Sequence, residues 1–238
     1  KSLNLVKKFK MPAVKISSGL MTNIPLVTEA SKIGVPMIIS TGMCFRKEIN
    51  KTFQIAKKYN RAGIALLKCT SLYPAPDNTI NLLAIKNFIN TFKIPIGYSD
   101  HTKDNLASLL AVSLGAKIIE KHFTLNKKQQ GVDHKFSSEP KEFKMLISDI
   151  RRIEVLMGSS LIKPHNKEIP KRNKYFRSIL AMKNIVKHEK LTISNVALKR
   201  SLNYQTSLSP KYFHQILGRR AKRNIQIDEK ILFSKLEK

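Results

Sequence analysis

The stretch from residue 93 to 124 constrains the fold most, because it contains two short apolar segments separated by a helical pattern. Residues 94–98 and 116–119 have the composition of buried strands, and the leucines between them are spaced for one helical face. Gly115 then stands where a helix would stop. This order predicts a β-α-β unit with parallel strands, whose carboxyl ends meet at one edge of a sheet.

Each of these two expected strands ends in an acidic residue and a histidine. The first runs into Ser99, Asp100 and His101, and the second runs into Glu120, Lys121 and His122. Two imidazoles at one edge of a sheet can share a divalent metal, and this is the first hypothesis for the pair. The alternative is that each histidine only caps its strand or makes a local hydrogen bond.

The preceding residues repeat the same alternation of strand and helix. A helix over 2–10 is expected first, then strands over 13–16, 36–40 and 63–69, with helices over 24–32, 47–59 and 80–92. Five apolar strands with crossover helices predict a parallel sheet, either doubly wound or part of an eight-stranded barrel. No glycine-rich phosphate fingerprint is present, which disfavours the doubly wound sheet.

Hydroxyl and ionisable residues gather where the expected strands end. Besides the two histidine segments, they are Ser18, Thr41, Thr70, Ser71 and Tyr73. In both candidate folds the loops after the strands carry the chemistry, so these side chains are candidates for a shared site.

The remaining residues predict the end of this domain and a second one. A helix is expected over 140–157, with Phe143, Leu146, Ile150, Ile153 and Leu156 as its buried stripe. Residues 159–173 hold two prolines among basic residues and are typical of a linker. Short alternating segments at 176–182, 191–198 and 221–227 predict a small β-rich domain. The expected domains are therefore 1–158 and 174–238, joined by the linker.

The composition restricts the partners that this chain can have. With 44 Lys and Arg against 16 Asp and Glu, the net charge is +28. The excess is mostly lysine spread along the chain, so we expect solvated surface lysine and a positive field that attracts phosphorylated substrates, with no nucleic-acid or membrane partner. Cys44 and Cys69 are too few for a disulfide framework, which favours a reducing cytoplasm. No apolar run approaches the ~20 residues of a membrane helix.

Several longer motifs follow one another along the chain, namely KISSG (15–19), PMIISTGM (36–43), CTSLYP (69–74), IGYSDHT (96–102), GAKIIEKHFT (115–124) and GVDHKFSSEP (131–140). Together they resemble the sialic acid synthase family, which includes N-acetylneuraminate, legionaminate and pseudaminate synthases. FRSILA (176–181), LKR (198–200) and ILGRRAKRNI (216–225) resemble the antifreeze-like (SAF) domain at the carboxyl end of these synthases.

The resemblance implies that the α/β part is a partial (β/α)8 TIM barrel holding the last five βα units. KISSG resembles the end of the family's fourth strand, so three strands, a catalytic glutamate and a phosphate-binding lysine are expected upstream. The chain also opens at Lys1 in an expected helix, without an initiating methionine. We therefore expect a fragment that is inactive alone.

The resemblance also implies the chemistry. The family condenses phosphoenolpyruvate with an N-acetylmannosamine-type sugar to give a nine-carbon 2-keto acid and phosphate. His101 and His122 would hold the metal, Mn2+ or Mg2+, and Glu120 and Asp133 would handle protons or sugar hydroxyls. The positions for binding phosphoenolpyruvate are Lys15, Ser18, Ser71 and Ser99. Tyr73 would lie against the sugar, together with Phe176 and Arg200 from the neighbouring subunit of a domain-swapped homodimer.

Some residues depart from the family pattern and leave alternatives open. Leu20 stands where an acidic residue usually contacts the sugar, Lys68 stands where His or Gln is frequent, and SLNYQTSLSP follows Arg200 in place of a glycine- and proline-rich segment. The sequence therefore leaves open a legionaminate or pseudaminate synthase that uses a diacetamido 6-deoxy sugar. It also leaves open a non-catalytic remnant that binds a sugar or a partner.

Overall fold

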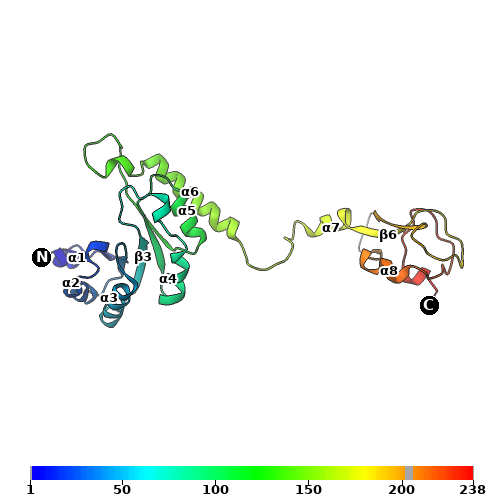
Figure 1. Cartoon of the computed structure of the whole chain (residues 1–238), viewed down its shortest axis with the longest axis horizontal. Helices are drawn as coiled ribbons and strands as arrows, with labels where there is room; N and C mark the ends of the chain where they lie inside the picture. The colour runs from blue at the N-terminus through cyan, green and yellow to red at the C-terminus, as the bar shows by residue number, and fades with distance from the viewer. Residues whose placement is uncertain (1, 202–205, 238) are drawn as a thin grey trace. The chain divides into compact units, whose positions relative to one another are not determined.

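The computed structural model describes residues 2–201 and 206–237, and the chain divides into two compact units, Lys1–Ser159 and Ser160–Lys238. The first unit alternates strands and helices (Figure 1) in the order α1 Ser2–Lys8, β1 Val14–Ile16, α2 Ile24–Ser31, β2 Met37–Ser40, α3 Arg46–Tyr59, β3 Ile64–Cys69, α4 Ala84–Phe92, β4 Ile96–Asp100, α5 Leu106–Ser113, β5 Ile118–Lys121 and α6 Pro140–Met157. None of the helices described is long and apolar enough to cross a membrane.

The five strands form one parallel sheet in the order β1-β2-β3-β4-β5. Adjacent strands lie about 4.8 Å apart, so a flat sheet would separate β1 from β5 by about 19 Å. Lys15 on β1 nevertheless contacts Glu120 on β5 directly, with 2.9 Å between Nζ and Oε1. The sheet is therefore curled like half of a barrel, as expected for a partial (β/α)8 fold.

Side-chain alternation along the strands builds the core. Residues such as Val14, Met37, Ile39, Leu66 and Tyr98 are buried in one apolar cluster, to which residues of α2, α3 and α4 also belong. Gly97 is required by close packing, because a Cβ there would lie 2.6 Å from the carbonyl oxygen of Ile118 on β5.

Some sequence-based boundaries in this unit were wrong. The helix expected at residue 80 begins at Ala84, after a short 3-10 turn at Asp77–Thr79. On α6 only Leu146 of the expected apolar stripe is buried, and Leu156 is 72% exposed. This helix packs mainly on α5, so one pair of helices covers only part of its stripe.

The second unit contains α7 Ile169–Tyr175 and the antiparallel strands β6 Arg177–Ala181 and β7 Val196–Arg200, followed by α8 Phe213–Ile216. It has its own apolar core, which includes Ile179, Leu191, Ile216 and Ile231. Helix α7 begins inside the expected linker, and its Tyr175 ring lies 5.3 Å from the guanidinium of Arg200. The strand expected at 221–227 is replaced by isolated bridges, and β7 covers only the end of the expected segment 191–198.

Candidate active site

A cavity of about 340 Å³ opens at the carboxyl ends of the strands in the first unit. Eight residues singled out in the sequence line it, which are Lys15, Ser18, Ser71, Tyr73, Ser99, His101, Glu120 and His122. They come from β1, β4 and β5 and from the segments that follow β1, β3, β4 and β5. The parallel register explains this convergence, because Ser99 on β4 pairs directly with Glu120 on β5.

Lys15, Glu120 and Ser99 form a polar chain across the cavity. The Lys15 ammonium lies 2.9 Å from Glu120 Oε1, and the Ser99 hydroxyl donates to the same oxygen at 2.6 Å. Both charged side chains keep about a third of their surface exposed (37% and 35%), so this ion pair contributes little to stability, at most about 1 kcal/mol. The two groups are therefore available to a ligand.

The two histidines lie together, as the parallel strands require. Their ring centroids are 5.3 Å apart, and the Tyr73 ring lies 4.2 Å from His101 and 5.7 Å from His122. His101 Nδ1 lies 2.7 Å from the carbonyl oxygen of Thr70. A carbonyl accepts only from a protonated nitrogen, so this contact fixes the proton on Nδ1 and leaves Nε2 free as a donor to a metal.

The pKa values of the histidines move in opposite directions. Burial lowers the pKa of His101, but its hydrogen bonds with Cys69 and the Thr70 carbonyl outweigh burial, and the net direction is upward. Burial, followed by the charge of His101, lowers the pKa of His122. His122 is therefore held neutral, the state in which an imidazole can bind a metal.

The remaining candidates lie around or away from the cavity. Asp133 Oδ2 is 3.7 Å from His122 Nδ1, although the Asp133 side chain is 59% exposed. Leu20 ends the 3-10 turn Ser18–Leu20, is 45% exposed and does not line the cavity. Phe176 and Arg200 belong to the second unit, so their role at the sugar stays a prediction. Part of the segment after Arg200, residues 202–205, lies outside the described residues.

Alternation excludes several strand-end residues from this cavity. The Asp100 carboxylate is buried on the opposite face, where it accepts from Lys121 at 2.9 Å and Ser108 at 2.6 Å. Thr41 donates to the Leu67 carbonyl at 2.9 Å, and neither Thr41 nor Thr70 lines the cavity. These three residues hold the ends of strands in place.

Five residues that line the cavity were not among the predicted site residues, namely Ser17, Gly19, Ser40, Met43 and Cys69. Ser40 ends β2, is 2% exposed, and its hydroxyl has no hydrogen-bond partner in the part of the chain described. Cys69 ends β3, with its sulfur 3.8 Å from His101 Nδ1. Both lie on the same strand face as Lys15 and Ser99, so counting every second residue back from each strand end would have found them.

Gly42 controls how closely the loops approach. Its amide donates to the Ser18 hydroxyl at 2.9 Å, and a Cβ at this position would clash with both Ser18 and Ser71. The absence of a side chain thus allows two cavity hydroxyls to face each other.

Known proteins are similar to this chain along nearly its whole length. Residues 1–161 match the model of the NeuB family, and residues 176–237 match the SAF domain. N,N'-diacetyllegionaminic acid synthase of Campylobacter jejuni is 40% identical over 232 residues, covering 97% of this chain and 69% of the relative. Pseudaminic acid synthase of Helicobacter pylori is 31% identical, covering 100% and 69%. The crystal structure of N-acetylneuraminic acid synthetase from Leptospira borgpetersenii is 38% identical, with a TM-score of 0.67 over 73% of this chain and 61% of that chain.

Proposed function

The chain belongs to the NeuB family and carries a SAF domain, and from this premise we propose that it condenses phosphoenolpyruvate with an N-acetylated amino sugar as part of a sialic-acid-type synthase. The observation that carries the proposal is the gathering of a lysine, five serines, a glutamate and two histidines in one cavity. The five strands of the first unit, with their helices, would be the last five βα units of a (β/α)8 barrel.

The side chains that line the cavity suit phosphoenolpyruvate, which is an anion. Lys15 supplies a cation, and Ser18, Ser71 and Ser99 supply hydroxyl donors for the phosphate and carboxylate of phosphoenolpyruvate. Ser40 adds a buried hydroxyl with no described protein partner. Glu120 lies within reach of the same groups and would take or give a proton, while Tyr73 would pack against the sugar.

His101 and His122 would hold a divalent metal. The Nδ1 proton of His101, which leaves Nε2 as the atom to bind a metal, and the neutral state of His122 fit such a role, and the raised pKa of His101 means that the metal would compete with a proton there. No group of three or more His, Cys, Asp and Glu residues converges within the described ranges, so substrate and water would complete the coordination. Nitrogen ligands fit Mn2+ better than Mg2+, which prefers oxygen. The metal would supply a Lewis acid for the aldehyde oxygen of the sugar.

A chimera tests this proposal, because the chain covers 69% of the C. jejuni relative. The remaining third of that relative is fused to residues 1–238, and phosphate release from phosphoenolpyruvate is measured with an acetamido sugar and Mn2+. We expect turnover that falls at least 100-fold in His101→Ala and His122→Ala, with His165→Ala, outside the cavity, as the matched control. A chimera that folds but releases no phosphate, or undiminished turnover in either cavity variant, contradicts the proposal.

For the acceptor we propose a diacetamido 6-deoxy sugar, because the relatives from C. jejuni and H. pylori are a diacetyllegionaminic acid synthase and a pseudaminic acid synthase. Two chimeras, one completed from the C. jejuni relative and one from the Leptospira borgpetersenii N-acetylneuraminic acid synthetase, separate the contribution of this chain from that of the added part. We expect both to prefer diacetamido sugars to N-acetylmannosamine in kcat/KM. A preference for N-acetylmannosamine in both would contradict this choice.

We further propose a domain-swapped homodimer in which Phe176 and Arg200 reach the sugar in the partner barrel. In the second unit Arg172 stacks 4.3 Å from the Phe176 ring, and Arg200 lies over Tyr175, so this end of the unit presents aromatic and cationic groups together. Such groups suit a polyhydroxylated acid.

A further inference from the structure

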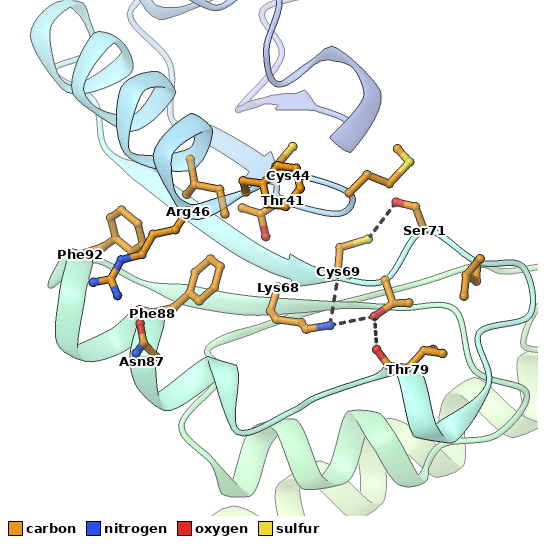
Figure 2. Close-up of a pocket in the computed structure, with 15 residues that line it drawn as sticks. Thr41, Cys44, Arg46, Lys68, Cys69, Ser71, Thr79, Asn87, Phe88 and Phe92 are labelled. Atoms are coloured by element: carbon orange, nitrogen blue, oxygen red, sulfur yellow. Dashed lines mark hydrogen bonds between the residues drawn. The ribbon is translucent and has the colours of Figure 1, made fainter.

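A second pocket, of about 550 Å³, adjoins the candidate active site and is larger than it (Figure 2). It lies beside the end of β3, between α3 and α4, and shares Met43, Cys69 and Ser71 with the cavity. Lys68 lines only this outer pocket. Apart from Ser71, no side chain that lines the outer pocket has a part in the proposed condensation.

Lys68 is a buried cation without an anion. The residue is 8% exposed, and its ammonium donates to Thr70 Oγ1 at 2.8 Å and to the Cys69 carbonyl at 3.3 Å. It forms no ion pair with any residue that the structure describes. Burial lowers its pKa, as expected where no carboxylate stabilises the charge.

Lys121 provides the comparison within the same sheet. Its side chain is 2% exposed, and its ammonium lies 2.9 Å from the Asp100 carboxylate, which is fully buried. The fold therefore supplies a counter-ion to one buried lysine on the outer face of the sheet and leaves the other without one. A buried unpaired charge is costly, and an anion bound at Lys68 would remove that cost.

The rest of the pocket suits the body of an organic molecule. Phe88 and Phe92 on α4 lie together on one side, with ring centroids 5.6 Å apart, and Ile49 and Phe45 add apolar surface. Figure 2 shows Arg46 beside these two rings, with Asn87 close by, while Lys68 lies nearer to Thr79. A ligand would thus meet aromatic rings and an exposed guanidinium in addition to the buried ammonium.

We propose that this outer pocket binds a small organic anion with an apolar or aromatic body, whose carboxylate or phosphate contacts Lys68. The site goes beyond the proposed condensation, and its ligand would lie behind Cys69 and Thr70, the residues that contact His101. A ligand there would therefore act on the candidate active site through the end of β3.

Calorimetry on residues 1–238 with phenyl phosphate and benzoate as probes tests the site. We expect at least one probe to bind, and Lys68→Met to raise its Kd at least tenfold, which is about 1.4 kcal/mol. Lys86→Met, on the exposed side of α4, is the matched control and should leave Kd unchanged. Benzyl alcohol and inorganic phosphate should each bind more weakly, because one lacks the charge and the other the apolar body.

Two further variants locate the probe. Arg46→Gln removes an exposed guanidinium whose long hydrogen bond to Thr91 Oγ1, at 3.4 Å, contributes little to the fold, and it should raise Kd about threefold. Lys15→Met removes the cation of the active-site cavity and should leave Kd unchanged. The proposal is overturned if neither probe binds the chain at 10 mM, if Lys68→Met binds as tightly as the parent, or if Lys15→Met alone abolishes binding.

Discussion

Along each strand of the parallel sheet, successive side chains point to opposite faces of the sheet. Ser99 and His101 enter the candidate active site, whereas Asp100 between them turns to Lys121 behind the sheet. The sequence allowed both histidines to be predicted at one edge, because parallel strands require it. It did not indicate that Glu120 pairs with Lys15, because that contact depends on how strongly the sheet curls.

The pair of Asp100 and Lys121 yields a prediction about stability. Lys121→Met leaves the Asp100 carboxylate buried with donors only from Thr102 and Ser108, so we expect unfolding free energy to fall by about 3–5 kcal/mol. Urea unfolding measures the loss, with the exposed Lys117→Met as the control. Lys68→Met should instead leave stability unchanged or raise it, because no anion is left behind. Equal losses in both lysine variants would contradict this account of the two buried charges.

At the scale of elements, the second unit is built on a repeated turn that the sequence analysis overlooked. Residues 184–191 (NIVKHEKL) and 224–231 (NIQIDEKI) share a pattern, and Ile185 pairs with Ile225 in an antiparallel bridge. Each asparagine side chain accepts a hydrogen bond from a backbone amide of the other copy. Asn224 accepts from the Lys187 amide at 2.8 Å, and Asn184 accepts from the Ile227 amide at 2.9 Å. The alternating patterns of strands could not reveal these turns, because side-chain hydrogen bonds hold them rather than the backbone hydrogen bonds of a sheet.

The second copy of the turn leads to a prediction about pH. Burial raises the pKa of Glu229, but hydrogen bonds from Lys235 and the Gln226 amide outweigh it and bring the pKa to about 2. Because folding lowers this pKa, the ionised carboxylate stabilises the fold. The contribution is complete above a pH of about 4.5, and it is lost as the pH falls toward 2. Glu229→Gln should therefore lower the stability of this unit by about 1–3 kcal/mol at pH 7, with the difference from the parent vanishing near pH 2.

Hydrogen exchange of the amides in β6 and β7 measures this difference, since it reports on the second unit alone. Glu168→Gln, at the start of α7, is the control, because the carboxylate of Glu168 lies outside the repeated turn. A constant difference between Glu229→Gln and the parent from pH 7 to pH 2 would contradict the assigned role of the carboxylate.

For the whole molecule, the five-stranded sheet has two edges. Within the described residues β1 pairs only with β2, and β5 pairs only with β4. Unpaired edges recruit strands from other copies, so residues 1–238 should self-associate as concentration rises. Sedimentation velocity at two concentrations measures this, and residues 160–238, which have their own core, should remain monomeric. A monomeric full chain at ~100 μM would contradict the prediction.

The contact between Lys15 and Glu120 also joins these two edge strands directly, across the open side of the curled sheet. Two side chains, with 2.9 Å between their charged atoms, bridge the cavity in this way. In the proposed function Glu120 occupies the ammonium of Lys15 until the anionic substrate arrives, so the two anions would compete for it. Because the pair is partly exposed and weak, exchanging one carboxylate for another would cost little, and the displaced Glu120 would become free to accept a proton as the cavity fills.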